Sequence, residues 1–236
     1  MKLKEFLSVR GIGFQSVNIA ESPEGLDELR RLGIRTIPVV TRGDAFVFGQ
    51  SLKDVAAFLG IAMEARQELP AAEIARRMDT ILAAAERFVR QMPDELLVHK
   101  VPNRDRTYRV LTHHIFRIPE SFIEVADDGT LLAESLVAPP PDDMRSVAQI
   151  ADYGADVRRR VAAWWASDPS RPDDRPVSTY FGSHPLREVM ERTAWHSGQH
   201  VRQLMAILEM EGIRPERPLG PADFDGLPLP EKVWDE

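Results

Sequence analysis

The sequence predicts a predominantly α-helical protein, in which a small α+β segment precedes an all-α four-helix bundle. Three observations lead to this prediction. Residues 1–62 alternate between short helix-like and strand-like patterns, whereas residues 70–236 contain four long amphipathic stretches. Pro70 stands at the change in composition and is well placed to begin a helix. Residues 1–68 carry nine basic and nine acidic side chains, so the rest of the chain carries the whole net charge of −7.

The composition narrows the class of protein. In 236 residues, 43% hydrophobic and 28% charged side chains are typical of a globular chain with a sizeable core. The absence of cysteine excludes disulfides, thiolate metal ligands and a cysteine nucleophile within this polypeptide. The acidic balance argues against nucleic-acid binding, and no apolar run approaches the ~20 residues of a membrane span. The first residues also lack a secretory signal pattern, so we expect a cytoplasmic protein.

The first segment is predicted to follow the order helix, strand, helix, strand, strand, helix. Glycines end the first helix, and Ser22 and Ser51 cap the two others. The Thr-Arg-Gly-Asp sequence at 41–44 joins the last two strands as a hairpin. The predicted helices cover residues 2–10, 22–33 and 51–59, and the predicted strands cover residues 15–19, 37–40 and 45–48.

The second segment is predicted to form the bundle, from four helices that expose one polar face each. Connections rich in proline and aspartate separate the last three helices, and Gly212 ends the fourth. The tail, residues 214–236, is rich in proline and glycine, and we expect it to pack over the bundle as an irregular strap. The predicted helices cover residues 71–92, 107–126, 146–166 and 185–211.

Two histidines lie on the apolar stripe of the fourth predicted helix. At about 100° per residue, His196 and His200 fall within about 20° of the centre of that stripe. A pair of imidazoles at positions i and i+4 can bind one divalent metal ion. Two hydrogen-bonded core histidines are the alternative interpretation.

The second predicted helix adds a third histidine. His114 falls at the edge of its apolar stripe, whereas His113 faces away from it. Four-helix bundles build metal sites from side chains on facing helices. Three protein ligands leave a coordination position open for water or substrate, which is the pattern of catalytic sites.

The motifs that carry these histidines resemble those of the DinB-like superfamily of metal-binding four-helix bundles. The resemblance covers residues 70–236 and lies in Leu-Thr-His-His-Ile at 111–115 and in the sequence from His196 to Leu204. It implies that His114, His196 and His200 are the metal ligands, and that the ion is zinc, nickel or iron, with zinc slightly preferred. Relatives include thiol-dependent transferases and isomerases, and they often form homodimers.

One position departs from the family's pattern. Many relatives have two adjacent histidines where this chain has Gln199 and His200. Gln203 lies two turns beyond His196 and one turn beyond His200, and is a candidate to orient an imidazole or a bound substrate; a solvated polar residue is the alternative. Trp195 is interpreted as packing in the bundle. We expect the two loop histidines, His99 and His184, to be exposed.

Residues 1–62 resemble the glutaredoxin-like branch of the thioredoxin fold. The sequence from Leu32 to Val40 is similar to that family's Thr-x-Pro segment, in which the proline is cis. The resemblance implies a thiol-binding site at Thr36, Pro38, Gly49 and Ser51. The family's first strand and Cys-x-x-Cys motif have no counterpart here, so this segment cannot exchange disulfides. Either the domain has become a binding module, or the natural chain begins upstream of Met1.

These features lead to two hypotheses about function. The first is a metal-dependent enzyme, such as a glutathione-type S-transferase or an isomerase, that uses a low-molecular-weight thiol to attack a small electrophile. The second is a non-catalytic stress-response protein that binds a metal or a thiol. Nucleic-acid binding has only the basic run at residues 158–160 in its favour, which is better interpreted as a solvated helix face.

Overall fold

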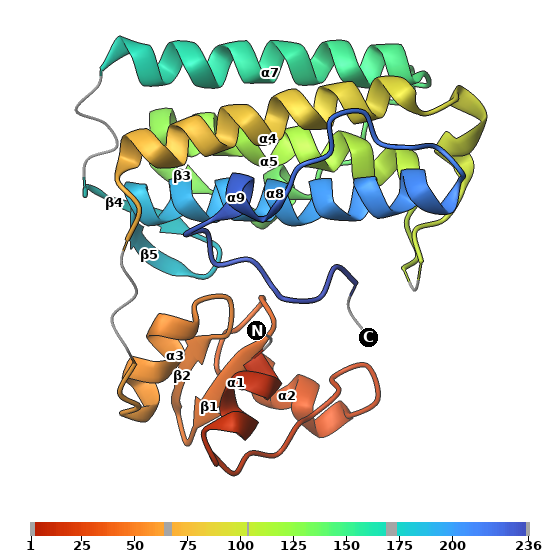
Figure 1. Ribbon diagram of the computed structural model, residues 1–236. Helices are drawn as coiled ribbons and strands as arrows, with labels where there is room; N and C mark the ends of the chain where they lie inside the picture. The colour runs from red at the N-terminus through yellow and green to blue at the C-terminus, as the bar shows by residue number, and fades with distance from the viewer. Residues whose placement is uncertain (1–2, 64–67, 103, 169–173, 235–236) are drawn as a thin grey trace. The chain divides into compact units, whose positions relative to one another are not determined.

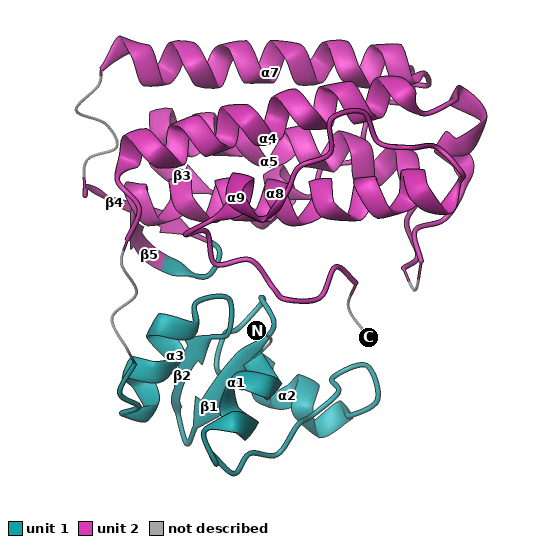
Figure 2. Cartoon of the chain, in the orientation of Figure 1, with its two compact units in different colours: residues 1–66, 180–182 teal, residues 67–179, 183–236 magenta. Residues whose placement is uncertain are grey.

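The computed structural model describes residues 3–63, 68–102, 104–168 and 174–234. The chain divides into two compact units, which are coloured separately in Figure 2. The smaller unit consists of residues 1–66 with 180–182, and the larger unit consists of residues 67–179 with 183–236. No helix among the described residues has the length and apolar character needed to cross a membrane.

The smaller unit packs three helices around one β-hairpin. Its apolar core contains Phe6 and Leu7 of the first helix with Val55 and Ala56 of the last. The hairpin is antiparallel, and Gly43 at its turn has a φ of 60°, which glycine adopts without strain. The elements are α1 (Leu3–Val9), α2 (Pro23–Arg31), β1 (Val39–Arg42), β2 (Ala45–Phe48) and α3 (Leu52–Leu59).

Two predictions for this unit are wrong. Residues 15–19 alternate like a strand but form none, because a strand needs a hydrogen-bonded neighbour and β1 and β2 pair with each other. The strand predicted at residue 37 begins at Val39, since Pro38 has no N–H for a ladder. The Ile37–Pro38 bond is cis, as the resemblance implied. The described residues of the unit hold a two-stranded sheet, so the thioredoxin fold is not supported.

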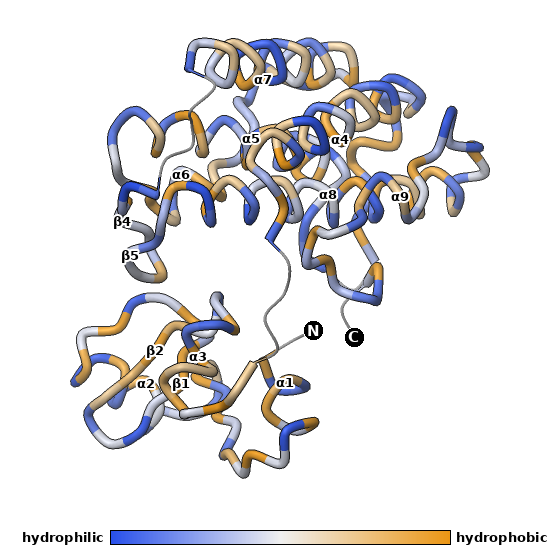
Figure 3. The backbone as a smooth tube through the Cα atoms, turned by 60° about the vertical axis from the view of Figure 1, so that its left-hand side comes forward, coloured by the Kyte–Doolittle hydropathy of each residue, from blue (hydrophilic) through white to orange (hydrophobic). Residues whose placement is uncertain are grey.

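The larger unit is a bundle of four long helices, as predicted (Figure 1). Helices α4 and α5 each pack against both α7 and α8. Along the backbone, hydrophobic and hydrophilic stretches alternate within each helix, as expected for faces that are turned in and out (Figure 3). The bounds are α4 (Ala71–Gln91), α5 (Tyr108–Asp128), α7 (Val147–Ser167) and α8 (Leu186–Met210).

Side-chain caps fix where two of these helices begin. The hydroxyl of Thr107 accepts a hydrogen bond from the backbone N–H of Val110 at 3.4 Å. Ser146 forms a capping box with Gln149, in which each side chain bonds the other residue's backbone. Such caps typically contribute about 1 kcal/mol each. The sequence therefore predicted these two starts to within one residue.

Short elements complete the chain, and the sequence analysis did not predict them. They lack enough residues to show a periodicity, and the parallel pairing of Thr130 with Ser178 joins positions far apart in the sequence. The elements are the 3₁₀ helix η1 (Asp94–Val98), the strands β3 (Thr130–Leu131), β4 (Pro176–Thr179) and β5 (Gly182–Pro185), and the helices α6 (Ala133–Leu136) and α9 (Pro221–Phe224).

The tail after α8 runs over the bundle as a strap, as predicted (Figure 1). Side chains of α4 hold its first part: Arg87 donates to the carbonyls of Glu216 and Arg217 at 2.7 and 2.9 Å. Arg77 donates to the carbonyl of Ala222 at 2.6 Å. Side chains of α4 thus satisfy these three carbonyls, although the strap holds little regular structure beyond the short α9.

Candidate metal centre

Three histidines of the bundle come together in space. His114 of α5 and His196 and His200 of α8 each offer a ring nitrogen, and these nitrogens lie within 4.8 Å of one another. The ring centroids are 5.4 Å apart for His114 and His196, 5.1 Å for His114 and His200, and 5.0 Å for the α8 pair. His200 is buried, and the other two are half-buried.

Packing between the helices fixes the register of the cluster. The hydroxyl of Ser197 donates to the backbone carbonyl of Ile115 at 3.1 Å, and both residues are fully buried. Because each is next to a cluster histidine in sequence, this bond holds α5 and α8 in register at the cluster. Gly198 faces α4, where an added Cβ would lie 3.3 Å from Ile81. Glycine therefore allows α4 to approach α8 closely at this level.

Gln203 determines which nitrogen of His200 is free. Its amide nitrogen donates to the carbonyl of Val233 at 3.0 Å, so its oxygen must be the atom 2.7 Å from His200 Nδ1. An amide oxygen can only accept, hence His200 Nδ1 carries a proton and donates it. His200 Nε2 then keeps its lone pair and can bind a cation. The bond places the Gln203 side chain against an imidazole of the cluster, and its orienting role stays a prediction.

The electrostatics keep the cluster neutral. Burial, together with the nearby positive charge of Arg106, lowers the pKa of His114 to about 4 and that of His200 to about 3. Burial also lowers the pKa of His196 well below its ordinary value. All three imidazoles are therefore neutral near pH 7, and each has one ring nitrogen that keeps its lone pair. A metal ion needs this form, because a protonated ring nitrogen has no lone pair to donate.

The donor set fits a divalent transition-metal ion. Three imidazoles suit zinc, nickel and iron, and their close approach is what a shared ion requires. No carboxylate joins the three histidines within the described part of the chain. Three protein ligands leave at least one coordination position for another molecule.

Comparison with known families identifies the larger unit. A sequence model of the DinB superfamily matches residues 67–204, which include α4, α5, α7 and nearly all of α8. The chain belongs to the DinB superfamily. Metal binding is common in this superfamily, and the three grouped histidines of this member could hold an ion. Searches of curated proteins and of solved structures found no match.

The remaining histidines lie outside the cluster. His113 points away from it, as predicted, but is buried against α7, where its ring stacks on Tyr153 at a centroid distance of 5.0 Å. His99 is exposed, as predicted, and lies 3.2 Å from a carboxylate oxygen of Glu211. The prediction for His184 is wrong: it is 6% exposed, since β5 turns its side chain inward, where Nδ1 lies 3.4 Å from Glu188.

Two neighbours of the cluster have other roles. Gln199, which stands where many relatives have histidine, donates to the carbonyls of Lys232 and Val233 at 3.1 and 2.8 Å. It therefore fastens the strap to α8. Trp195 is half-buried, and the guanidinium of Arg192 lies 5.3 Å from its ring centroid.

The four residues predicted to bind a thiol lie outside the family match, in the smaller unit. The N–H of Gly49 donates to the carbonyl of Pro38 at 2.8 Å, which brings these two together. The hydroxyl of Ser51 caps α3 by accepting from Asp54 N at 3.2 Å. Thr36 is half-buried and Pro38 is exposed. The Gly49 N–H is thus already used within the chain and is not available to a ligand carboxylate.

Arg106 is the neighbour that the sequence analysis missed. One of its guanidinium nitrogens lies 3.4 Å from His200 Nδ1 and 3.4 Å from the amide oxygen of Gln203. It precedes α5 in a loop, so helical periodicity gives no signal for it. The sequence showed only that a basic residue, Arg106, stands shortly before α5, the helix that carries His114.

Proposed function

We propose that this DinB-superfamily member is a metal-dependent enzyme that transfers a low-molecular-weight thiol to a small electrophile. The observation that carries the proposal is the group of three neutral histidines with a coordination position left over. A closed structural site normally uses four protein ligands, whereas catalytic sites use three. Zinc is the preferred ion, with nickel and iron as the alternatives.

In this proposal His114, His196 and His200 hold the ion, and Gln203 fixes the ring of His200. A divalent ion held by these residues would supply a positive charge that lowers the pKa of a thiol. The thiol proton would leave to solvent and the sulfur would form a bond to carbon of the electrophile. In a substitution the leaving group departs with its electron pair, and in an addition to an unsaturated carbonyl compound the electron pair moves to the carbonyl group and a proton is taken up from solvent. The strap supports this arrangement from outside, because the carbonyl of Val233 holds Gln203.

The smaller unit adds a second, weaker part of the proposal. Thr36, Pro38, Gly49 and Ser51 would contact the thiol, such as glutathione, through the exposed ring of Pro38 and the turn beside it. The use of the Gly49 N–H within the chain makes a backbone carboxylate site there less favourable. A cytoplasmic location and a homodimer stay predictions.

Turnover assays test the proposal. Zinc-loaded protein is incubated with glutathione or another small thiol and a panel of alkyl halides, epoxides and unsaturated carbonyl compounds, and the loss of free thiol is followed. We expect turnover that disappears in His200→Ala and persists in His99→Ala, in which an exposed histidine is lost. Stoichiometric metal binding without turnover on any pair would favour the non-catalytic binding protein instead.

A further inference from the structure

Arg106 is held beside the histidine cluster by the backbone that precedes α5. Lys100 and Thr107 form an antiparallel bridge, and the N–H of Val101 donates to the carbonyl of Arg106 at 2.9 Å. The N–H of Tyr108 donates to the carbonyl of His99 at 2.8 Å and continues this pairing. The backbone at Arg106 is therefore fixed by hydrogen bonds on both sides, and its side chain reaches His200 from a rigid support.

Among the described residues, no carboxylate pairs with the guanidinium of Arg106, and the charged neighbour that acts on it is Arg104, which is also positive. The Nε atom of Arg106 is buried and makes no hydrogen bond. Its Nη2 atom lies 3.4 Å from the amide oxygen of Gln203, which is a long contact to a neutral acceptor, and 3.4 Å from His200 Nδ1, which carries a proton and cannot accept a bond. A half-buried cation without a counter-charge is costly unless an anion arrives to pair with it.

Other arginines of the bundle that are buried or half-buried are satisfied within the chain. Arg87, Arg109 and Arg202 donate to backbone carbonyls at 2.7, 2.7 and 2.6 Å, and two further arginines pair with acids. Arg117 donates to both carboxylate oxygens of Glu124 at 2.7 Å and to Glu120 at 2.7 Å. Arg77 pairs with Glu73 at 3.0 Å. Arg106 thus differs from two arginines of the same domain in having no acid, and it is the one that lies at the candidate metal site.

The metal site has the same deficit of negative charge. Three neutral imidazoles contribute no charge, so a divalent ion there would keep its +2, to which Arg106 adds +1. A ligand that brings two negative groups, one for the ion and one for the guanidinium, would balance this charge.

We propose that Arg106 is a specificity-determining residue that binds a carboxylate of the thiol whose sulfur occupies the open metal position. This inference rests on the proposed function and names the substrate class of the same site: small thiols that carry a carboxylate. A guanidinium suits this role because it can donate two parallel hydrogen bonds to the two oxygens of a carboxylate. The Nε–H of Arg106 makes no hydrogen bond, and the Nη2 atom lies on the same edge of the guanidinium, so these two donors could bind the two carboxylate oxygens.

Binding measurements on cobalt-loaded protein test the inference without requiring turnover. The ligands are 2-mercaptoacetate, 3-mercaptopropionate and 4-mercaptobutyrate, each compared with its own primary amide, so that the unknown span between ion and guanidinium is sampled. Binding is followed by the absorption bands of the cobalt ion. The variants are Arg106→Gln and Arg106→Lys, and the matched control is Arg104→Gln, which removes an equal charge from an exposed neighbour.

We expect the wild-type protein to prefer the acid over its amide by about tenfold or more at one chain length, the size of a hydrogen bond to a charged group. The ratio falls to about one in Arg106→Gln, falls partly in Arg106→Lys and is unchanged in Arg104→Gln. If Arg106→Gln does not fold or load cobalt, Arg106→Lys decides the question, because it keeps the charge and loses the fork. Metal-loaded variants at position 106 that keep the full preference, or a wild type with none, would overturn the inference alone. A wild type that takes up no metal would overturn the proposed function with it.

Discussion

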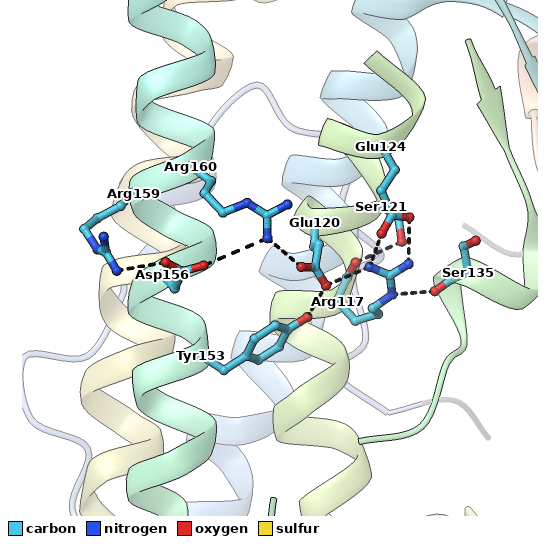
Figure 4. Close-up of polar contacts among 9 residues, drawn as sticks. All are labelled: Arg117, Glu120, Ser121, Glu124, Ser135, Tyr153, Asp156, Arg159 and Arg160. Carbon is cyan, nitrogen blue, oxygen red and sulfur yellow. Dashed lines mark hydrogen bonds and ion pairs between the residues drawn. The ribbon is translucent and has the colours of Figure 1, made fainter. Parts of the chain in front are cut away.

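Helix α5 separates two polar regions of the bundle that use similar side chains and differ in charge balance. On the side that faces α8, His114 meets two neutral histidines, and no carboxylate in the described part of the chain pairs with Arg106 nearby. On the side that faces α7, His113 stacks on Tyr153. The network beyond it pairs two arginines, Arg117 and Arg160, with two acids, Glu120 and Glu124 (Figure 4).

The charge balance distinguishes the two regions. The polar network on the α7 side supports the fold, whereas the histidine cluster on the α8 side is suited to a ligand. Glu120 accepts from Tyr153 at 2.7 Å, from Arg117 at 2.7 Å and from Arg160 at 2.6 Å, so its charge is fully compensated within the chain. The histidine cluster instead brings three ring nitrogens within 4.8 Å of one another, where they could share one ion. Adjacent residues of one helix therefore belong to regions of different kinds.

The largest expected effect contrasts the two adjacent histidines. His114→Phe removes one of three ligands and should weaken zinc binding by more than about a hundredfold, beyond the 10–100-fold typical of outer-shell changes. His113→Phe keeps the stack on Tyr153 and removes a buried Nδ1 that has no hydrogen bond, so zinc affinity should not change. Competition with a chelator measures both affinities, and equal losses in the two variants would contradict the comparison.

The next effect concerns Gln203, which links the cluster to the strap. Gln203→Leu removes the acceptor for His200 Nδ1 and the donor to Val233, and we expect zinc affinity to fall about 10–100-fold. Gln199→Leu is the control, because Gln199 bonds the same part of the strap and does not contact the three histidines. If both variants lose affinity equally, the strap and not the orientation of His200 is responsible.

On the α7 side, Glu120→Gln should cost about 2 kcal/mol of unfolding free energy and leave zinc affinity unchanged. The value is below the 3–5 kcal/mol of a fully broken buried pair, because Arg117 keeps Glu124 and Arg160 keeps Asp156. Urea unfolding of the metal-free protein measures it. A Glu124→Gln variant, at a site whose carboxylate is 39% exposed, should lose less.

The smallest expected effect is the pH dependence of the unfolding free energy that Glu120→Gln loses. Burial alone would raise the pKa of Glu120, but hydrogen bonds from Tyr153, Arg160 and Arg117 outweigh it and lower the pKa. A carboxyl whose pKa is lower in the folded state stabilises the fold above its unfolded pKa and loses that contribution as pH falls through the folded value. The stability difference between wild type and Glu120→Gln should therefore be constant above about pH 5 and narrow below about pH 4. A difference that widens on acidification would contradict the assignment.

Helical periodicity explains how much of the centre the sequence could predict. A spacing of four residues puts His196 and His200 on one face, and the apolar stripe of α5 orients His114 toward it. The same rule puts Gln203 one turn from the site. These residues could be placed because each relation is local to one helix, and the bundle brings the two stripes together.

The features that were missed depend on contacts between distant segments. Arg106 reaches the cluster through a loop pairing, and His184 is buried through strand pairing, neither of which leaves a periodic signal. The partnership of Glu120 with Arg160 requires the register between α5 and α7. At residues 15–19 the sequence analysis predicted a strand that does not form, because the alternating pattern has no neighbouring strand to pair with.

The central claim is that the three histidines form a metal site. Calorimetric titration of metal-free protein with zinc tests it most directly, in wild type and in His114→Phe. We predict one ion per chain for the wild type and loss of that binding in the variant. A wild-type protein that takes up no zinc, nickel or iron, or a variant that binds as the wild type does, would contradict it.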